Sequence, residues 1–213
     1  MKIIKPYHEI MTPLDGESIL KHIEECGRVC YKSEHKISEE SYKTFIGNII
    51  KRDHETVLEH FSFTVKFVCD RGVSHEIVRH RLASYCQEST RYCNYSKDDF
   101  CGEITVIKPN FLIEKTPAWT VWQNACEITE SRYFALLNIG LTPQEARAVL
   151  PNSLKTELTM TTNIREWRHF LKLRTSKAAH PQIREIAISL LDELKSLVPI
   201  VFEDIEAWRG ESK

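Results

Sequence analysis

The sequence predicts one α+β domain in which a central, mostly antiparallel sheet is flanked by helices, with more helix than strand. The run FSFTVKF at 61–67 alternates apolar and polar residues, which is typical of a half-buried strand. Several longer runs carry apolar residues at the helical period instead. No repeat, low-complexity tract or Ser/Gly-rich linker interrupts the 213 residues, of which 42% are hydrophobic. We therefore expect a single domain over residues 1–213.

Two helices are predicted before the 61–67 strand. The first covers residues 17–26, and the second follows Ser38, a candidate N-cap residue. The apolar face of the second helix comprises Phe45, Ile46, Ile49 and Ile50. In the strand itself, the predicted buried side comprises Phe61, Phe63, Val65 and Phe67.

Shorter strands and further helices are predicted after it. The strand candidates are ITVI at 104–107 and LTMTT at 158–162. A long helix is predicted over 117–138 and is ended by Gly140. Residues 142–145 have the pattern of a capping box with proline at the first helical position, and Asn163 with Glu166 repeats the cap pattern. The last helix has apolar residues at helical spacing over 183–197 and stops near Pro199.

Charge and cysteine content exclude several classes of protein. The formal net charge of -1 argues against a general nucleic-acid binder that relies on overall positive potential, so any anion site must be local. The seven cysteines are odd in number and form no CxxC pair, which favours a reduced, cytoplasmic protein without a disulfide framework or zinc site. No signal-like apolar run begins the chain and no uncharged stretch of about 18 residues occurs in it, so we expect neither export nor membrane insertion.

The familiar catalytic and phosphate-binding motifs are missing. Seven glycines are too sparse for a Rossmann turn or a P-loop, so side chains must hold any bound phosphate. His75 and His80 are five residues apart, where a zinc hydrolase motif needs four, so we predict no metal site. Ser89 and His80 suggest a nucleophile pair, but no sequence feature supplies the third, orienting carboxylate.

Two runs are rich in arginine. Residues 71–91 contain four arginines and two glutamates, a local charge of +2, and residues 163–174 carry a local charge of +3. If the helix that follows Gly72 continues through the first run, His80 and Arg81 lie beside its apolar flank. In the second run Arg165 and His169 share a helix side, while Arg174 prolongs the apolar stripe of Trp167, Phe170 and Leu171, a position from which an arginine can be aimed into a cleft. Such cations need acidic partners or a bound anion.

Other interpretations of these cations stay open. Basic residues on a helix are most often a solvated face or weak surface ion pairs. An RNA-binding module that uses arginines and exposed tyrosines would bind RNA in a salt-dependent way and be colourless. A nucleotide-phosphate hydrolase would need a metal, but no carboxylate cluster suited to Mg²⁺ occurs near the arginines.

The run RHRLASYCQESTRY at 79–92 resembles the RHR-x7-S motif of the flavin-dependent thymidylate synthases, with Arg79-His80-Arg81, seven residues, and then Ser89. Further matches follow in family order, at 28–33 (RVCYKS), 54–60 (HETVLEH), 146–151 (ARAVLP) and in the 163–174 segment. The likeness covers most of the chain and is weakest over 100–140. Cys30, Cys86, Gln87 and Glu76 replace residues that are commoner in the family, and the arginines are intact.

The resemblance implies a cytoplasmic homotetramer that binds FAD between subunits. It would convert dUMP to dTMP with methylenetetrahydrofolate as carbon donor and NADPH as reductant, with no nucleic-acid or membrane partner. The residues implied to bind FAD are Thr56, Arg79, His80, Arg81, Gln87, Asn163, Arg165 and His169. Those implied to bind dUMP are Glu76, Arg79, Gln87, Glu88, Ser89, Thr90, Arg91, Arg147 and Arg174.

The chemistry of these side chains is compatible with those roles. The ligands bring phosphates and flat rings, which guanidinium groups hold without a glycine loop. Arg174 would be the catalytic residue, because its charge against the uracil would stabilise negative charge that develops on the ring; a preorganised donor of this kind is typically worth about 2.7 to 4 kcal/mol. Ser89, with no base in evidence beside it, would position the substrate rather than attack it.

Overall fold

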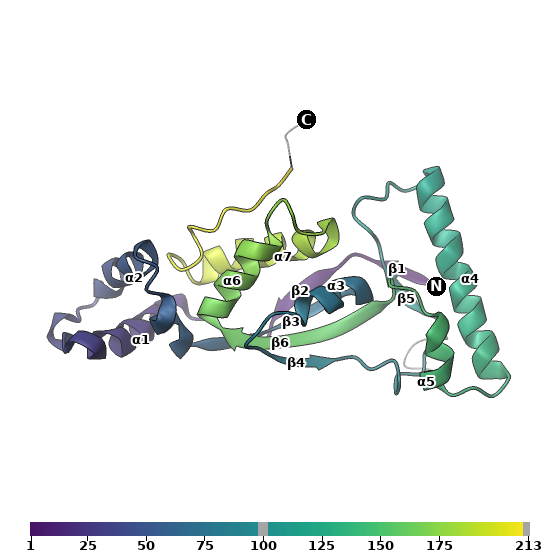
Figure 1. Cartoon of the computed structure of the whole chain (residues 1–213), viewed down its shortest axis with the longest axis horizontal. Helices are drawn as coiled ribbons and strands as arrows, with labels where there is room; N and C mark the ends of the chain where they lie inside the picture. Colours follow the sequence, from purple (N-terminus) through teal and green to yellow (C-terminus); the bar gives the residue numbers. More distant parts are fainter. Residues whose placement is uncertain (98–101, 211–213) are drawn as a thin grey trace. The chain divides into compact units, whose positions relative to one another are not determined.

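The computed structural model describes residues 1–97 and 102–210 (Figure 1). The chain forms two compact units, each assembled from three segments. The first unit comprises residues 1–7, 66–79 and 85–159, and the second comprises residues 8–65, 80–84 and those from 160 onward. The peptide bond between Arg79 and His80 therefore leads from one unit into the other. A single domain over 1–213 stays a prediction.

The strands confirm the predicted α+β class with its antiparallel sheet flanked by helices. Four of them, β2 (Tyr7–Ile10), β3 (Ser62–Asp70), β4 (Ser84–Gln87) and β6 (Lys155–Asn163), form a sheet in the order β2-β3-β6-β4. In β3 the side chains of Phe63, Val65 and Phe67 are buried, as their alternation predicts, and the predicted strands at 104–107 and 158–162 form. In the first unit, β1 (Lys2–Ile4) and β5 (Thr105–Ile107) pair in parallel, with Ile3 opposite Val106.

The second unit holds most of the long helices. They are α1 (Gly16–Arg28), α2 (Ser41–Lys51), α6 (Ile164–Arg174) and α7 (Pro181–Leu197), with short 3-10 segments η1 (Val29–Tyr31), η2 (Glu34–Lys36) and η3 (Glu55–His60). Helix α1 packs against α2, and α6 packs against η3 and α7 (Figure 1). Phe63 stacks on Trp167 with ring centroids 5.0 Å apart, and the Trp167 indole donates to the Phe63 carbonyl. This packing fixes which face of α6 is buried.

In the first unit the elements are α3 (Arg71–Ile77), α4 (Pro117–Asn138), α5 (Pro143–Ala146) and η5 (Arg147–Val149). Helix α4 has the predicted bounds, and the capping box of Thr142 and Glu145 is present. A cluster of buried residues, with Tyr95, Val106 and Tyr133 among them, forms the core beside α4. The predicted helices and caps therefore hold in this unit, with α3 as the exception.

The prediction that the helix after Gly72 continues through the 79–91 run is wrong. Helix α3 ends at Ile77, and the chain reaches strand β4 seven residues later. In a longer helix the Ile77 carbonyl would accept from the Arg81 N–H, but the Tyr85 hydroxyl donates to it at 3.0 Å. The RHR motif therefore lies on a connection, where its side chains are not bound to the helical period.

The predicted N-cap at Ser38 is also wrong. Helix α2 begins at Ser41, and its N-cap residue is Glu40. The Ser41 hydroxyl accepts from the Ser38 backbone N–H at 2.9 Å and donates to the buried Glu24 carboxylate at 2.7 Å. The start of α2 is thus anchored to α1.

Two further predictions concern the environment of the chain. In the part of the chain that the structure describes, no helix combines the length and apolar character that a membrane crossing requires. Six cysteines are free thiols, as predicted: Cys26, Cys30, Cys69, Cys86, Cys93 and Cys126. Cys101 lies outside the described residues.

Candidate active site

A pocket of about 490 Å³ opens beside α6 in the second unit. We call it the α6 pocket; its lining is Glu55, Glu59, Arg81, Leu82, Asn163, Arg165, Glu166, His169 and Lys172. Arg165, His169 and Lys172 are four and three residues apart, so one face of α6 carries all three into the wall. Asn163 caps the helix, its side chain accepting from the Glu166 N–H at 2.9 Å. Sequence spacing predicted the shared side of Arg165 and His169, and the pocket confirms it.

Cations and carboxylates alternate in the wall of the α6 pocket. Arg165 donates to Glu59 at 2.5 Å, and Lys172 donates to Glu55 at 3.4 Å. Arg81 makes no ion pair with any described residue and is exposed. An anion that enters the pocket therefore meets one open guanidinium group and a second, Arg165, whose exposed pair with Glu59 is weak and exchangeable.

A chain of three side chains ends at this pocket. The Arg174 Nε–H donates to His80 Nε2 at 3.0 Å, and His80 Nδ1 lies 3.3 Å from Glu166 Oε1. Because an arginine can only donate, His80 Nε2 must be the bare nitrogen and Nδ1 must carry the proton. The His80 Nδ1–H then donates to the Glu166 carboxylate. Glu166 therefore sets the tautomer that allows His80 to hold Arg174.

Burial keeps His80, the middle member of these three side chains, in its neutral form. The His80 side chain is almost wholly buried and packs edge-on against Phe170, with ring centroids 4.9 Å apart. Burial, aided by the charge of Arg174 and by His169, lowers the pKa of His80 to about 4. Burial raises the pKa of Glu166, and His169 opposes that shift. At neutral pH His80 is therefore uncharged and remains an acceptor for Arg174.

His80, Glu166 and His169 also have the spacing of a metal-binding group. Each offers one ligand atom, and these atoms lie within 4.8 Å of one another. No spacing along the chain indicates this group, because His80 is 86 residues from Glu166. His80 carries a proton on Nδ1, whereas a nitrogen that binds a metal must be deprotonated. The nearby cations Arg81, Arg165 and Lys172 would also repel a dication, so we keep the prediction that the site holds no metal.

Arg168, three residues from Arg165 and four from Lys172 on α6, has a different role. Its guanidinium is 1% exposed and donates to Glu55 at 2.9 Å and to Asp204 at 2.6 Å and 2.8 Å, as well as to the Val201 carbonyl. Burial alone would raise the pKa values of Glu55 and Asp204, but the Arg168 guanidinium holds both below their usual range. Arg168 is therefore a structural cation with no capacity left for a ligand.

The residues implied to bind dUMP lie mostly in the first unit. Arg147 donates to Thr90 Oγ1 at 3.1 Å, which brings two of them together. The Gln87 amide donates to Ser74 at 2.8 Å and to Thr156 at 3.3 Å. Glu88 accepts from Tyr95 at 3.0 Å and pairs with Lys155 at 2.9 Å. Gln87 and Glu88 are thus held in place by the protein itself.

The other members of that set are divided. Ser89 Oγ accepts from the Arg91 backbone N–H at 3.3 Å, and the Arg91 guanidinium lies over Tyr92. Glu76 is half-buried at the end of α3, and Arg79 is exposed just beyond it. Arg174 belongs to the second unit. Of the FAD set, Thr56 lies on η3 between Glu55 and Glu59, Arg79 and Gln87 lie in the first unit, and the other five lie in or beside the α6 pocket.

Sequence reasoning missed the acids of the site. Glu55 and Glu59 line the α6 pocket, and Glu166 holds His80. The only signal for Glu166 was its cap position, and there the structure forms half of the expected box: Asn163 accepts from the Glu166 N–H, while the Glu166 side chain turns to His80. An acid at this cap position was therefore a sign of the site as well as of the helix start.

The sequence matches the family model "Thymidylate synthase complementing protein" over residues 17–200. Among curated relatives, the flavin-dependent thymidylate synthase of Geobacter sulfurreducens is 34% identical over 83% of this chain and 78% of its own length. The enzyme of the same name from Mycolicibacterium gilvum is 33% identical over 94% of this chain and 84% of its own.

The fold has a solved counterpart. A UMP/dUMP methylase, PolB, from Streptomyces cacaoi, bound with 5-Br dUMP, superposes with a TM-score of 0.77 at 23% identity, covering 95% of this chain and 96% of that one. The family match spans both arginine runs and the whole of α6. This chain therefore belongs to the thymidylate synthase complementing protein family, the family of the flavin-dependent thymidylate synthases.

Proposed function

We propose that this protein methylates dUMP reductively to dTMP, taking the methylene group of methylenetetrahydrofolate and reducing equivalents from NADPH through FAD. Family membership carries the coarser part: the protein is an FAD-dependent methyltransferase. The observation that supports the finer part is the Glu166–His80–Arg174 chain, which fixes an arginine beside a pocket whose walls carry Arg81 and Arg165.

The α6 pocket fits the charged part of FAD. Arg81, Arg165 and Asn163 supply donors for a diphosphate, which guanidinium groups bind bidentately. Glu59 would release Arg165 to the phosphate, since an exposed pair of this kind contributes only about 0–1 kcal/mol. His169 lines the pocket and adds a flat polar ring, whose centroid lies 5.6 Å from that of the buried His80. FAD, when bound, supplies the hydride transfer, and the protein supplies orientation and charge.

We assign dUMP to the second group of residues. Arg79, Arg91 and Arg147 would hold its phosphate, and Ser89 and Thr90 would position it with their hydroxyls. Gln87, Glu88 and Glu76 would contact its base or sugar. Gln87 and Glu88 are already fixed by Ser74 and Lys155, so they present their remaining polar atoms in a set orientation.

Arg174 is the group we assign to catalysis. A guanidinium against the uracil ring stabilises negative charge that develops there and so activates the ring carbon as a nucleophile. The neutral His80 ring accepts from Arg174 Nε and leaves the charge on the guanidinium undiminished. Burial keeps His80 neutral, so it does not repel the arginine that it holds.

We also propose the assembly and the location. The homotetramer that the resemblance implies needs apolar surface between subunits, and α4 exposes Val121 and Ile128, which are seven residues apart and so share a face. Ligands between subunits would be small-molecule nucleotides and folate, with no nucleic-acid or membrane partner. The free thiols of the described cysteines suit a cytoplasmic enzyme.

The deciding experiment is the visible spectrum of the purified protein followed by an activity assay. We expect a yellow protein, or one that becomes yellow with FAD, which oxidises NADPH and forms dTMP from dUMP only when methylenetetrahydrofolate is present. A colourless protein that does not take up FAD but binds RNA in a salt-dependent way would overturn the proposal.

A further inference from the structure

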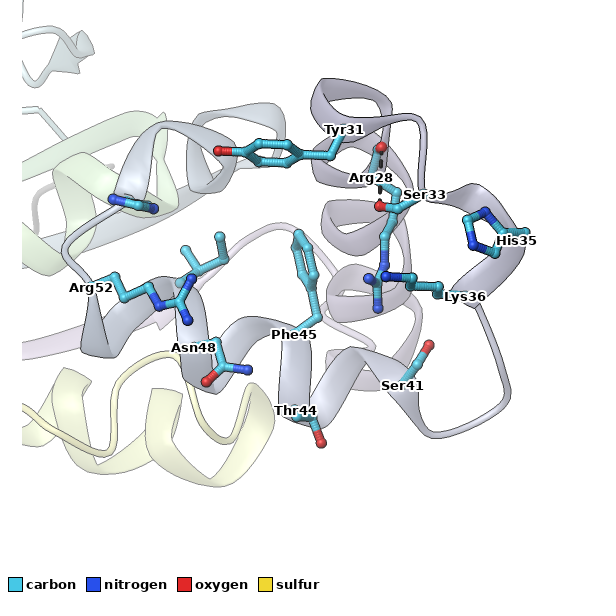
Figure 2. A pocket seen from close by; sticks show the side chains of 12 residues that line it. Arg28, Tyr31, Ser33, His35, Lys36, Ser41, Thr44, Phe45, Asn48 and Arg52 are labelled. Atoms are coloured by element: carbon cyan, nitrogen blue, oxygen red, sulfur yellow. Dashed lines mark hydrogen bonds between the residues drawn. The ribbon is translucent and has the colours of Figure 1, made fainter.

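A second pocket lies at the α1–α2 end of the second unit, outside the α6 pocket. Its volume is about 770 Å³, within the range of about 300–1,000 Å³ that is usual for small-molecule sites. We call it the basic pocket; its lining is Arg28, Tyr31, Ser33, His35, Lys36, Ser41, Thr44, Phe45, Asn48, Ile49, Arg52 and His54 (Figure 2). None of these twelve described residues is acidic, whereas three carry permanent positive charge.

One of the three cations is already neutralised. Arg28 donates to Glu24 at 3.0 Å and 2.6 Å, and Glu24 is 1% exposed. Glu24 lies behind the wall and also accepts from the Ser41 hydroxyl at 2.7 Å. This buried carboxylate therefore ties α1 to the start of α2 and leaves Arg28 as a fixed part of the wall.

The other two cations are unopposed. Among described residues, Lys36 and Arg52 make no side-chain hydrogen bond or ion pair, and the same holds for Thr44, Asn48 and His54. In the view of Figure 2, Lys36 and Arg52 extend into the pocket from opposite sides. Two cations that face one pocket repel each other, and an anion bound between them would remove that repulsion.

Aromatic surface lies between these cations. The Phe45 ring occupies the middle of the view in Figure 2, the Arg28 guanidinium lies 4.8 Å from its centroid, and Tyr31, which is 85% exposed, extends along one side. Gly27 allows this position: a Cβ there would lie 2.5 Å from Phe45 Cζ. The pocket thus offers a flat ring to stack against and two charges to hold an anion, and its donors at Thr44 and Asn48 are uncommitted.

We infer that the basic pocket binds a ligand with a planar ring and at least two negative charges, the ring on Phe45 or Tyr31 and the charges on Lys36 and Arg52. This step rests on the proposed function, in which two co-substrates carry a planar ring and at least two negative charges. The charges of NADPH are on phosphates, and those of methylenetetrahydrofolate are on carboxylates. Both are distinct from the two ligands already assigned to other residues. The pocket is therefore the place where a co-substrate is held.

The test is calorimetric titration of the FAD-loaded protein, separately with NADP⁺ and with folic acid. The variant carries Lys36→Gln and Arg52→Gln, and its matched control carries Lys43→Gln and Lys51→Gln, which remove the same charge from exposed positions of α2 outside the pocket. For one of the two ligands we expect the variant to raise Kd by about tenfold or more, which corresponds to about 1.4 kcal/mol, because it removes both cations that would hold the negative charges.

The ligand that weakens identifies the source of the charges, phosphate or carboxylate. Equal Kd values in variant and wild type for both ligands would overturn the inference, and so would an equal loss in the control. Because the titration measures binding, the result is separate from dTMP formation. A protein that forms no dTMP but loses NADP⁺ or folic acid binding in the variant alone would refute the proposed reaction and support the basic pocket.

Discussion

The α6 pocket and the basic pocket lie in the same unit and have similar numbers of cations, but they differ in their acids. In the α6 pocket Glu55, Glu59 and Glu166 contribute to the wall, and each has a partner within the protein. The described residues that line the basic pocket include no acid, and the Glu24 carboxylate that pairs with Arg28 is buried. In the α6 pocket a ligand finds Arg81 open but must displace Glu59 to reach Arg165, whereas in the basic pocket both Lys36 and Arg52 are open.

The largest effect should come from Arg168, which neutralises Glu55 beside the α6 pocket. Arg168→Met leaves Glu55 and Asp204 without their guanidinium, and losing one partner of a buried ion pair costs about 3–5 kcal/mol. Urea unfolding should show that loss in the free energy of unfolding. Arg165→Met, which removes an exposed cation from the same helix, should change it by less than about 1 kcal/mol. Equal losses in both variants would mean that burial does not distinguish the two arginines.

Arg174 should show the largest effect on turnover. Arg174→Ala should lower kcat by about 100-fold or more, the loss expected when one preorganised donor is removed, while flavin absorbance is largely retained. Ser89→Ala should be milder, because we assign Ser89 to positioning. An Arg174→Ala enzyme with near-normal kcat beside an inactive Ser89→Ala enzyme with normal dUMP affinity would show that the roles are wrongly assigned.

Glu166 tests whether an acid of the α6 pocket acts through His80. Glu166→Leu removes the acceptor of the His80 Nδ1–H, so the tautomer that holds Arg174 is no longer fixed. We expect kcat to fall about tenfold, which corresponds to about 1.4 kcal/mol, with little change in KM for dUMP. Glu166→Gln keeps an acceptor oxygen and should restore most of the rate. If Gln is as slow as Leu, the carboxylate charge rather than the hydrogen bond is what matters.

The pH dependence of stability should carry the signature of His80. Its pKa is about 4 in the folded protein and about 6.5 in the unfolded chain, so the unfolded state binds more protons between these values. Stability from this group is therefore full above pH 6.5 and is lost progressively as pH falls toward 4. Unfolding curves at pH 7 and pH 4.5 should differ less for His80→Asn than for the wild type. An unchanged difference would show that His80 is not buried as a neutral group.

The smallest effect should come from Glu59. Glu59→Gln frees Arg165 from its exposed pair, so FAD should bind about two- to fivefold more tightly, in line with the value of such pairs. Fluorescence titration of the FAD-free protein with FAD measures this change. Glu40→Gln, which frees Lys43 on α2, should leave FAD affinity unaltered. Weaker FAD binding in Glu59→Gln would mean that the acid contacts the ligand itself.

Local patterns predicted the elements well where a single period or cap decides them. Helix α4 over 117–138, the alternation of β3 and the shared side of Arg165 and His169 all follow from the order of apolar and polar residues. The end of α3 does not follow from such a pattern, because the Ile77 carbonyl accepts its hydrogen bond from the hydroxyl of Tyr85, eight residues along the chain. The family resemblance identified the arginines of the site, but it did not identify the acids that decide which arginines are paired within the protein and which can bind a ligand. Glu55 and Asp204 hold Arg168 across 113 and 36 residues, and no local rule anticipates such pairs.

The close contact of Gly27 with the Phe45 ring links two positions of the chain that are 18 residues apart. Any larger residue at 27 would push the ring away from α1, so alanine at 27 demands a smaller side chain at 45. Relatives that keep an aromatic residue at 45 should therefore keep glycine at 27, and those that lose the glycine should also lose the aromatic residue. Such covariation would show which members of the family retain an aromatic ring between α1 and α2 on which a planar ligand can stack.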